Sequence, residues 1–325
     1  MKAFNAVVRI ATVGVLMAIA CSVGAQQDYP NKPIRFIVPY AAGSTLDILG
    51  RLVGQKLSER WGQSVVVDDR PGGNTVIGTE AMLQSSPDGY TLMLTSSGHT
   101  LIPQLLPVSF DPIKDFAPVA TISRTEFILV ASPSLPANNL REVIALLKVQ
   151  PGKFNYASTG VGTGPHVAGE LLNIMAGVRM EHIPYKGSVQ ALTDLVAGRV
   201  QIFISTVIVS IPFIKSGRIK AIAVSGETRQ SALPEVPTFT EAGLPGFDVK
   251  TWLGILAPAK TPKPIIDRLS TEVAKILVLP DIKEKLDSQG LVPFISTPEQ
   301  FAAQIKVDMA KYAKIIKIAN IKLAN

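Results

Sequence analysis

Short runs of β-branched and aromatic residues alternate with amphipathic stretches along the chain, and this alternation predicts an α/β architecture. The run Ile34–Val38 predicts a strand. Apolar residues then recur at helical spacing from Leu46 to Trp61, after a turn rich in Gly, Ser and Thr. Further strands are predicted at Val65–Val67, Thr91–Thr95 and Phe127–Ala131.

A second series of the same kind begins after Pro133. Asn139 and Glu142 have the spacing of a capping box and predict the start of a helix that ends near Val149. The remaining elements predicted in this series are strand Phe154–Ser158, helix Pro165–Ala176, a strand around His182 and Ile183, helix Ser188–Ala197, and strands Ile202–Ser205 and Ala221–Val224. Residues 231–246 are rich in Pro and Gly and predict a connection.

Helices dominate the end of the chain. Trp252–Leu256 predicts a strand that returns to the first lobe. Helices are predicted at Lys263–Leu277, at Asp281–Gln289 and after Thr297, where Pro298 and Gln300 complete the capping pattern. We therefore expect one lobe to be inserted into the other, with residues 26–126 and 251–325 forming lobe 1 and residues 127–250 forming lobe 2.

Residues 1–25 have the pattern of a cleaved signal peptide. Lys2 and Arg9 flank the start of an uncharged apolar run that ends at Cys21, and Val23-Gly24-Ala25 supplies small residues for cleavage. The run is shorter than the ~20 residues of a membrane-spanning helix. A lipoprotein with an acylated Cys21 is the alternative that stays open. We expect an exported, soluble protein.

The net charge of the chain is only a weak indication of its partners. The 325 residues include 32 Lys or Arg and 25 Asp or Glu, which gives a formal net charge of +7. The excess is spread along the chain without a dense basic run, so we expect no nucleic-acid partner and favour anionic ones. The single cysteine, Cys21, excludes a disulfide framework and a multi-cysteine metal site. The length predicts two lobes, at roughly 150 residues each.

The motifs of common catalytic and cofactor sites do not occur in this sequence. His99, His166 and His182 lack metal-binding spacing, and there is no G-x-S-x-G nucleophile motif. Residues 160–164 read G-x-G-x-G, which differs from the dinucleotide-binding G-x-G-x-x-G. We therefore expect no metal, no cofactor and no enzymatic activity.

Two loops share one design, in which a strand is followed by small polar residues with glycine and then by a helix. Such loops bring unpaired N–H groups of a helix amino terminus close to a ligand, and they favour an anion such as a carboxylate. The residues that we expect to bind it are Tyr40, Ala41, Ala42, Gly43, Ser44 and Thr45 in the first loop and Ser158, Thr159, Gly162, Thr163 and Gly164 in the second. The alternative is that both loops are plain turns with Ser or Thr caps.

Several nearby residues allow a structural and a functional interpretation. Asp47 at the start of its helix complements the helix dipole, and Arg51 has the spacing of an i,i+4 partner for it. Lys186 is a solvated charge or, because it lies in a loop, faces a cleft. If the amide groups of the second loop hold a carboxylate, Gly162→Val should weaken binding tenfold or more, about 1.4 kcal/mol.

The chain contains a set of motifs whose order and spacing are specific. They are residues 29–34 (YPNKPI), 38–43 (VPYAAG) with Asp47 and Arg51, 69–73 (DRPGG), 87–92 (PDGYTL), 156–163 (YASTGVGT) with His166, 184–187 (PYKG) and 257–262 (APAKTP). With these motifs the chain resembles the Bug-type solute-binding receptors of tripartite tricarboxylate transporters over nearly its whole length.

The resemblance implies a two-lobed periplasmic binding protein fold of type II-like architecture, with two hinge strands and a ligand cleft between the lobes. It implies a small organic anion as ligand and a membrane permease as partner, with residues 40–45 and 158–164 as the pincer loops. We add Ser97, His99 and Ser205 as expected ligand-binding residues. Ser44, Leu46, Ile102 and Gln201 depart from the common family pattern, and Gln201 would offer the ligand a neutral amide where many relatives have Asp.

Several hypotheses for the function stay open on the sequence. The leading one is a carboxylate receptor that delivers its ligand to a permease, and the second is a receptor that signals to a membrane sensor. An enzyme on a similar scaffold would need a catalytic motif, and the effector domain of a transcription regulator would need DNA-binding helices. Mono-, di- and tricarboxylates all satisfy backbone donors, with water bridging the gaps.

Overall fold

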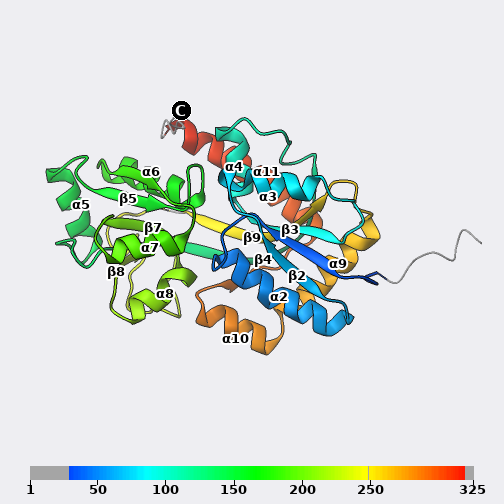
Figure 1. Cartoon of the computed structure of the whole chain (residues 1–325). Coiled ribbons are helices and arrows are strands. Elements are labelled where there is room, and N and C mark those ends of the chain that lie inside the picture. The colour runs from blue at the N-terminus through cyan, green and yellow to red at the C-terminus, as the bar shows by residue number, and fades with distance from the viewer. Residues whose placement is uncertain (1–28, 248, 319–325) are drawn as a thin grey trace, which may run out of the picture.

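The computed structural model describes residues 29–247 and 249–318, so the predicted signal peptide and Cys21 lie outside the described residues. Two lobes lie side by side, and the long strands β4 (Phe116–Ala131) and β9 (Lys250–Pro258) run between them (Figure 1). Within the described ranges, the structure contains no helix that combines the length and the apolarity needed to cross a bilayer.

Lobe 1 is built on a sheet in which three parallel strands are followed by an antiparallel one. The strand order is β2 (Val65–Asp69), β1 (Ile34–Val38), β3 (Thr91–Ser96), β9 and β4, and the short β10 (Val292–Pro293) pairs with β4. Its helices are α2 (Thr45–Trp61), α3 (Val76–Leu83), α4 (Gly98–Leu105), α9 (Lys263–Leu277), α10 (Pro280–Ser288) and α11 (Pro298–Ile318), with a 3₁₀ turn η1 at Gly73–Thr75.

Lobe 2 repeats this construction with the middle of the chain. Its strands are β7 (Ile202–Thr206), β5 (Asn155–Ser158), β6 (Glu181–Pro184) and β8 (Lys220–Val224). Strands β5, β6 and β7 are parallel to one another, whereas β7 and β8 both pair antiparallel with β4. Its helices are α5 (Leu140–Val149), α6 (Gly164–Ala176), α7 (Ser188–Val196) and α8 (Val207–Lys215).

Strand β4 changes partners where the chain passes from one lobe to the other. Up to Glu126 it pairs with β9, and from Phe127 on it pairs with β7 and β8. A lobe boundary between residues 126 and 127 stays a prediction. Only the second part of β4 was predicted as a strand, because Pro118 and the alternating polar residues of its first part obscure the pattern.

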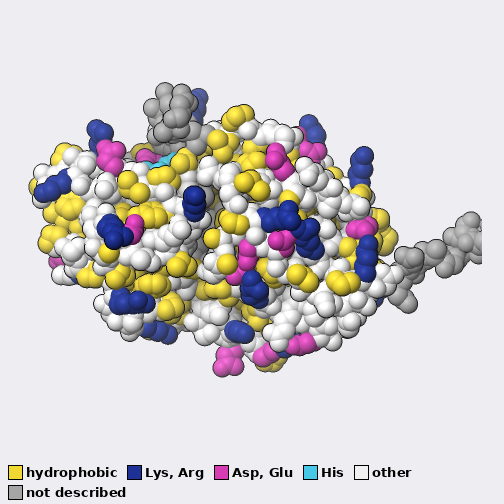
Figure 2. Space-filling view, viewed as in Figure 1, with side chains coloured by type: hydrophobic (Ala, Val, Ile, Leu, Met, Phe, Trp, Pro, Cys, Tyr) yellow, Lys and Arg dark blue, Asp and Glu magenta, His cyan; other side chains and the backbone are white. Residues whose placement is uncertain are grey.

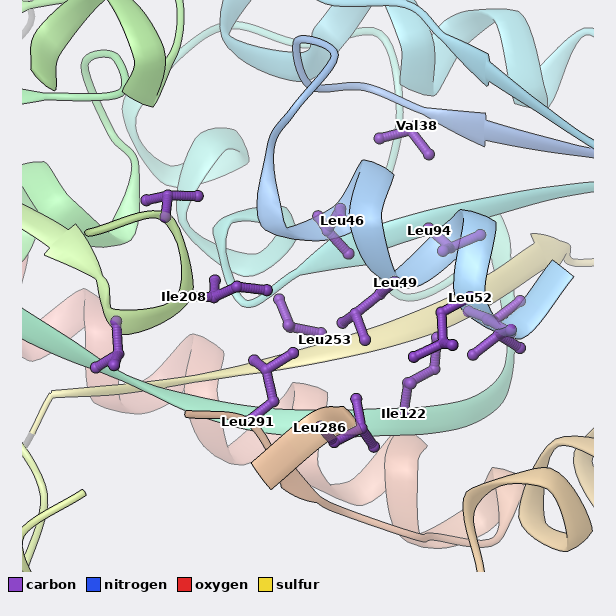
Figure 3. Close-up of a cluster of buried hydrophobic side chains, with 14 of the residues drawn as sticks. Val38, Leu46, Leu49, Leu52, Leu94, Ile122, Ile208, Leu253, Leu286 and Leu291 are labelled. Carbon is purple, nitrogen blue, oxygen red and sulfur yellow. The ribbon is translucent and has the colours of Figure 1, made fainter. Parts of the chain in front are cut away.

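The core between α2 and the sheet explains why α2 forms where the sequence predicts it. Leu46, Leu49 and Leu52 lie on one face of the helix and point toward Leu253 and the long strands (Figure 3). Burial of one such leucine stabilises the fold by about 1.5–3 kcal/mol. The cluster includes Ile208 of α8, so the apolar core continues from lobe 1 into lobe 2.

Three helices that the structure contains were not predicted. α3 follows a glycine-rich turn, and α4 contains Pro103. α8 begins with Val207-Ile208-Val209, whose β-branched side chains favour strands, and it contains Pro212. Tertiary packing overrides these local preferences, because residues 207–211 of α8 are all buried.

Candidate functional site

A cavity lies between the two lobes at the ends of the strands that lead into the helices. Its lining comes from both lobes and from the connecting strands β4 and β9. The lining residues are Tyr40, Ala41, Ser44, Thr45, Leu46, Ser96, Gly98, Phe127, Thr159, Thr163, Gly164, Pro165, Lys186, Gly187, Ser188, Thr206, Thr251 and Leu253. The cavity is therefore lined by both hydroxyl groups and apolar side chains.

Five helices present their amino termini to this cavity. The cap or first residue of α2, α4, α6, α7 and α8 lines it, at Ser44, Gly98, Gly164, Gly187 and Thr206 respectively. The first turn of each helix has N–H groups without an intrahelical acceptor, and the helix dipole adds partial positive charge there. Their convergence makes the cavity favourable for an anion.

A positively charged side chain at the cavity reinforces this preference. Lys186 lines the cavity and both hollows that adjoin it, and of the described residues lining these three spaces it is the only charged one. No hydrogen bond or ion pair of the Lys186 ammonium occurs within the described ranges of the chain. On the surface in Figure 2, by contrast, Lys and Arg are interspersed with Asp and Glu.

The first loop leads from β1 into α2 and is held by residues of its own helix. Gly43 has a φ of +77°, a conformation that glycine adopts without strain, and its N–H donates to Asp47 Oδ2 at 2.8 Å. The Ser44 N–H donates to the Ala41 carbonyl at 3.1 Å, and Ser44 Oγ accepts from the Asp47 N–H at 3.3 Å. The first-turn amides of Thr45 and Leu46 are left to face the cavity.

The carboxylate of Asp47 is neutralised by an arginine of its own helix. Arg51 Nε lies 2.6 Å from Asp47 Oδ1, and Arg51 Nη2 lies 3.2 Å from Asp69 Oδ2. Burial and the nearby Asp47 raise the pKa of Asp69. Asp47 therefore holds the loop, and the predicted i,i+4 pair with Arg51 is present.

The second loop leads from β5 into α6 and has the same turn. Gly162 also has a φ of +77°, and the Thr163 N–H donates to the Gly160 carbonyl at 3.3 Å. The Gly162 N–H donates to His166 Nδ1 at 3.0 Å, and the Gly160 N–H donates to Ser158 Oγ at 3.1 Å. The first-turn amides of α6 are the groups left for an anion, since these three amides of the loop already have partners.

The two lobes touch across the cavity. The hydroxyls of Thr45 and Thr206, one from each lobe, are 2.9 Å apart. A Cβ atom built on Gly187 would lie 3.2 Å from Ala41 Cβ.

Burial raises the pKa of the Tyr40 hydroxyl, which is 2.8 Å from Ser96 Oγ. Tyr40 therefore stays neutral at the wall of the cavity.

The structure brings most of the predicted site residues together. Of those expected to bind an anion, seven line the cavity: Tyr40, Ala41, Ser44, Thr45, Thr159, Thr163 and Gly164. Ala42 and Gly43 line the smaller hollow that adjoins it. The two loops therefore face each other across one space.

Five predicted residues lie behind the wall instead. Ser97 Oγ is 2.8 Å from Thr251 Oγ1, and Ser158 and Ser205 are fully buried. His99 is 4% exposed, its Nε2 is 2.9 Å from the Pro112 carbonyl, and it packs against two phenylalanines, so it belongs to the core. Burial lowers the pKa of His99 to about 4. Gly162 is the fifth residue.

The positions of Gly162 and Gln201 change two interpretations made from the sequence. The Gly162 amide already donates to His166, and a Cβ atom at Gly162 would lie 2.9 Å from Leu105 Cδ1 of α4. Gly162 thus supports the loop and faces the other lobe. Gln201 precedes β7 at the end remote from Thr206, and its Oε1 accepts from the Asn155 N–H at 3.1 Å, so it offers no amide to the cavity.

Sequence reasoning missed part of the lining. The missed residues are Leu46, Ser96, Gly98, Phe127, Pro165, Gly187, Ser188, Thr206, Thr251 and Leu253. Gly187-Ser188 before α7 and Thr206 before α8 repeat the small polar residues that precede a helix, and they could have been found by that pattern. Thr251 and Leu253 carry no such pattern, because β9 contributes them through its place between the lobes.

The lining residues suit an anion more than a metal ion. Throughout the described ranges, no group of three His, Cys, Asp or Glu side chains could hold a metal. The cavity combines backbone donors, hydroxyls and Lys186 with apolar Leu46, Phe127 and Leu253. This combination fits a carboxylate group attached to a short carbon chain.

Known proteins resemble this chain over most of its length. The family described as "Tripartite tricarboxylate transporter family receptor" matches residues 49–321. Protein BugT of Bordetella pertussis is 33% identical over 323 residues, covering 97% of this chain and 98% of BugT. The structure of Rpa4515 from R. palustris with adipate has a TM-score of 0.88 and 33% identity, covering 91% of this chain and 99% of that chain. MatC from Rhodopseudomonas palustris with bound malate has a TM-score of 0.82 and 28% identity, covering 89% of this chain and 100% of that chain.

These comparisons confirm the resemblance drawn from the sequence motifs. They also confirm the predicted fold class, a two-lobed α/β binding protein. The region that the family model matches, residues 49–321, includes the second loop that faces the cavity.

Proposed function

Because the chain belongs to the tripartite tricarboxylate transporter receptor family, which makes it a solute-binding receptor and not an enzyme, we propose that it captures a small organic carboxylate between its lobes and delivers it to a membrane permease. The observation that carries the proposal is the convergence of five helix amino termini on a cavity whose described lining includes no acidic side chain. The adipate and malate of two similar structures are ligands of this chemical class.

The chemistry of the wall supports the capture of a carboxylate without a buried cation. Amides at the start of α2 and α6 would hold one carboxylate from both lobes, and the hydroxyls of Ser44, Thr45 and Thr163 add donors. Leu46 and Leu253 would cover the carbon chain. A ligand held from both lobes stabilises the arrangement in which they touch.

The proposal includes the location of the protein, its oligomeric state and the movement of its lobes. We propose a monomer of the periplasm, exported by its first 25 residues, with lobes of residues 26–126 plus 251–325 and of residues 127–250. The lobes would turn about β4 and β9 as the ligand enters and leaves. A receptor that must present its ligand to a permease needs such an opening.

A thermal-shift screen over organic acids, with adipate and malate among them, tests the capture of a carboxylate. A ligand at 100 times its dissociation constant adds ~2.7 kcal/mol to the free energy of unfolding. We expect at least one mono-, di- or tricarboxylate to raise the melting temperature, and the matching uncharged amide not to do so. A library in which no carboxylate raises it would contradict the proposal.

Delivery to a permease needs a second test. Bacteria that lack this receptor should lose uptake of the identified acid, and the gene should restore it. If uptake is unchanged while an acid-dependent signalling response disappears, the receptor serves sensing instead of transport.

A further inference from the structure

The two loops that face the cavity are built on the same frame, and one position of that frame differs between the lobes. In each loop a glycine with a φ of +77° precedes the helix cap, and its amide donates to the side chain four residues later. That side chain is Asp47 in lobe 1 and His166 in lobe 2. An imidazole nitrogen thus takes the place of a carboxylate oxygen.

The hydrogen bond from Gly162 defines the chemical state of His166. A nitrogen that accepts an N–H carries no proton, so the Nδ1 atom of His166 is bare and the ring is neutral with its proton on Nε2. The side chain is 5% exposed and does not line the cavity. His166 therefore acts on the cavity through the loop and not by touching a ligand.

A second histidine supports the other end of the same loop. The ring of His182 stacks on that of His166 with centroids 4.0 Å apart and an angle of 19°. His182 Nε2 lies 2.6 Å from Ser158 Oγ, and Ser158 Oγ accepts the Gly160 N–H. Burial lowers the pKa of His166 to about 4 and that of His182 to about 3, so both rings stay neutral near pH 7.

The surroundings of the pair favour a supporting role. The ring of Tyr156 also stacks on His182, with centroids 4.9 Å apart, and its hydroxyl donates to Glu170 Oε1 at 2.6 Å. Nearly parallel rings at 4.0 Å point their nitrogen lone pairs along the ring planes, so the two imidazoles do not converge on a common ion. The pair fills the space beneath the loop instead.

We propose that His166 is a positioning residue for anion binding, which holds the Gly162 amide on its unprotonated Nδ1 and so aims the amino terminus of α6 into the cavity. Asp47 does the same for α2. The inference rests on the proposed function, because the direction of the α6 amino terminus affects binding only if the ligand is an anion held there. His182 secures the position of the ring by stacking.

Two substitutions of similar shape separate the hydrogen bond from the packing. In His166→Asn, Oδ1 occupies the place of Nδ1 and keeps an acceptor for the Gly162 amide, whereas His166→Leu removes it. Both variants lose the stacked ring. We expect His166→Leu to weaken adipate binding at least tenfold in calorimetry and His166→Asn to bind within threefold of the unaltered protein. Equal adipate affinities in the two variants would overturn the proposal.

A measurement without ligand decides the proposal even if a variant does not fold or adipate does not bind. In the unaltered protein, ¹⁵N spectra of the imidazole should show His166 with its proton on Nε2, and the Gly162 amide should exchange slowly with solvent. A proton on Nδ1, or rapid exchange of that amide, would overturn the proposal. Failure of every organic acid to bind would instead contradict the proposed function.

Discussion

Lys186 places a positive charge on the cavity wall that no described acidic group balances. In Lys186→Met the wall loses this charge while the helix amino termini remain. Because a charged donor beside a carboxylate contributes about 1.4 kcal/mol or somewhat less at an exposed position, we expect a fivefold to tenfold loss of affinity for the acid found in the screen. Calorimetry at low salt measures it.

The control for Lys186 is Lys215, an exposed lysine at the far end of α8. Lys215→Met changes the net charge equally, so its effect reports long-range attraction alone. Equal affinities in the two variants would mean that Lys186 makes no local contact with the ligand.

Alanine substitutions at Gly162 and Gly177 distinguish the effect of backbone strain from the effect of contact between the lobes. Both have positive φ, but a Cβ atom at Gly162 would lie 2.9 Å from Leu105 Cδ1, whereas nothing lies within 4 Å of one at Gly177. We expect both alanine variants to lose about 1 kcal/mol of stability in urea unfolding. Only Gly162→Ala should also weaken binding, threefold or more, because the side chain of Leu105 in lobe 1 must move to make room for it. Unchanged affinity in Gly162→Ala would show that this contact is irrelevant to binding.

At the scale of the elements, the caps of α2 and α5 allow a matched comparison. Ser44 Oγ accepts from the Asp47 N–H, and Asn139 Oδ1 accepts from the Glu142 N–H. Replacement of either cap by Ala should cost about 1 kcal/mol of stability. Ser44→Ala should weaken binding as well, since Ser44 lines the cavity and Asn139 does not. Equal binding by both variants would speak against an anion at the amino terminus of α2.

The elements also show what the sequence can predict. Helix α9 begins and ends where predicted, at Lys263 and Leu277, because its amphipathic pattern matches its burial. At the start of α5, Asn139 Oδ1 accepts from the Glu142 N–H as a capping box requires, whereas Glu142 Oε2 accepts from the Asn138 N–H instead of from that of the cap. α8 was not predicted, because its β-branched start has no helical preference and its place is fixed by packing between the lobes.

The two loops could be predicted from the local sequence, but the cavity as a whole could not. Glycine, Ser and Thr before a helix indicate both loops from the sequence alone. Phe127, Thr251 and Leu253 enter the wall only because β4 and β9 pass between the lobes. His99 was expected at the ligand and lies in the core, since the polarity of a histidine does not show that its one hydrogen bond is satisfied internally.

For the whole molecule, buried histidines predict loss of stability in acid. Burial lowers the pKa values of His99 and His166 to about 4 and that of His182 to about 3, while an unfolded histidine titrates near pH 6.5. The unfolded chain therefore binds more protons between pH 6.5 and 4, so the free energy of unfolding falls as the pH is lowered. Urea unfolding at pH 7, 6 and 5 should show a slope that approaches three protons at pH 5.

The variant His99→Gln provides the control for this pH dependence. It removes one of the three groups and should lower the slope by about one proton. A free energy of unfolding that stays constant from pH 7 to pH 5 would contradict the neutral, buried state of these side chains.

The central claim is that an organic anion binds between the lobes, and a reversible crosslink across the cavity tests it most directly. Ala41 and Gly187 belong to different lobes, and a Cβ atom at Gly187 would lie 3.2 Å from Ala41 Cβ, within a few tenths of an ångström of the roughly 3.5–4.5 Å found in disulfides. Gly187 has an extended φ of −178°, which any residue adopts. The chain from residue 26 on has no cysteine of its own.

The measurement is the rate at which Ala41→Cys/Gly187→Cys binds the acid found in the screen, first oxidised and then reduced. With the lobes joined at the mouth of the cavity, the oxidised protein should take up the acid at least a hundredfold more slowly or not at all. Reduction of the same sample should restore binding. Equal and rapid binding in both states would place the ligand outside the cavity and contradict the account.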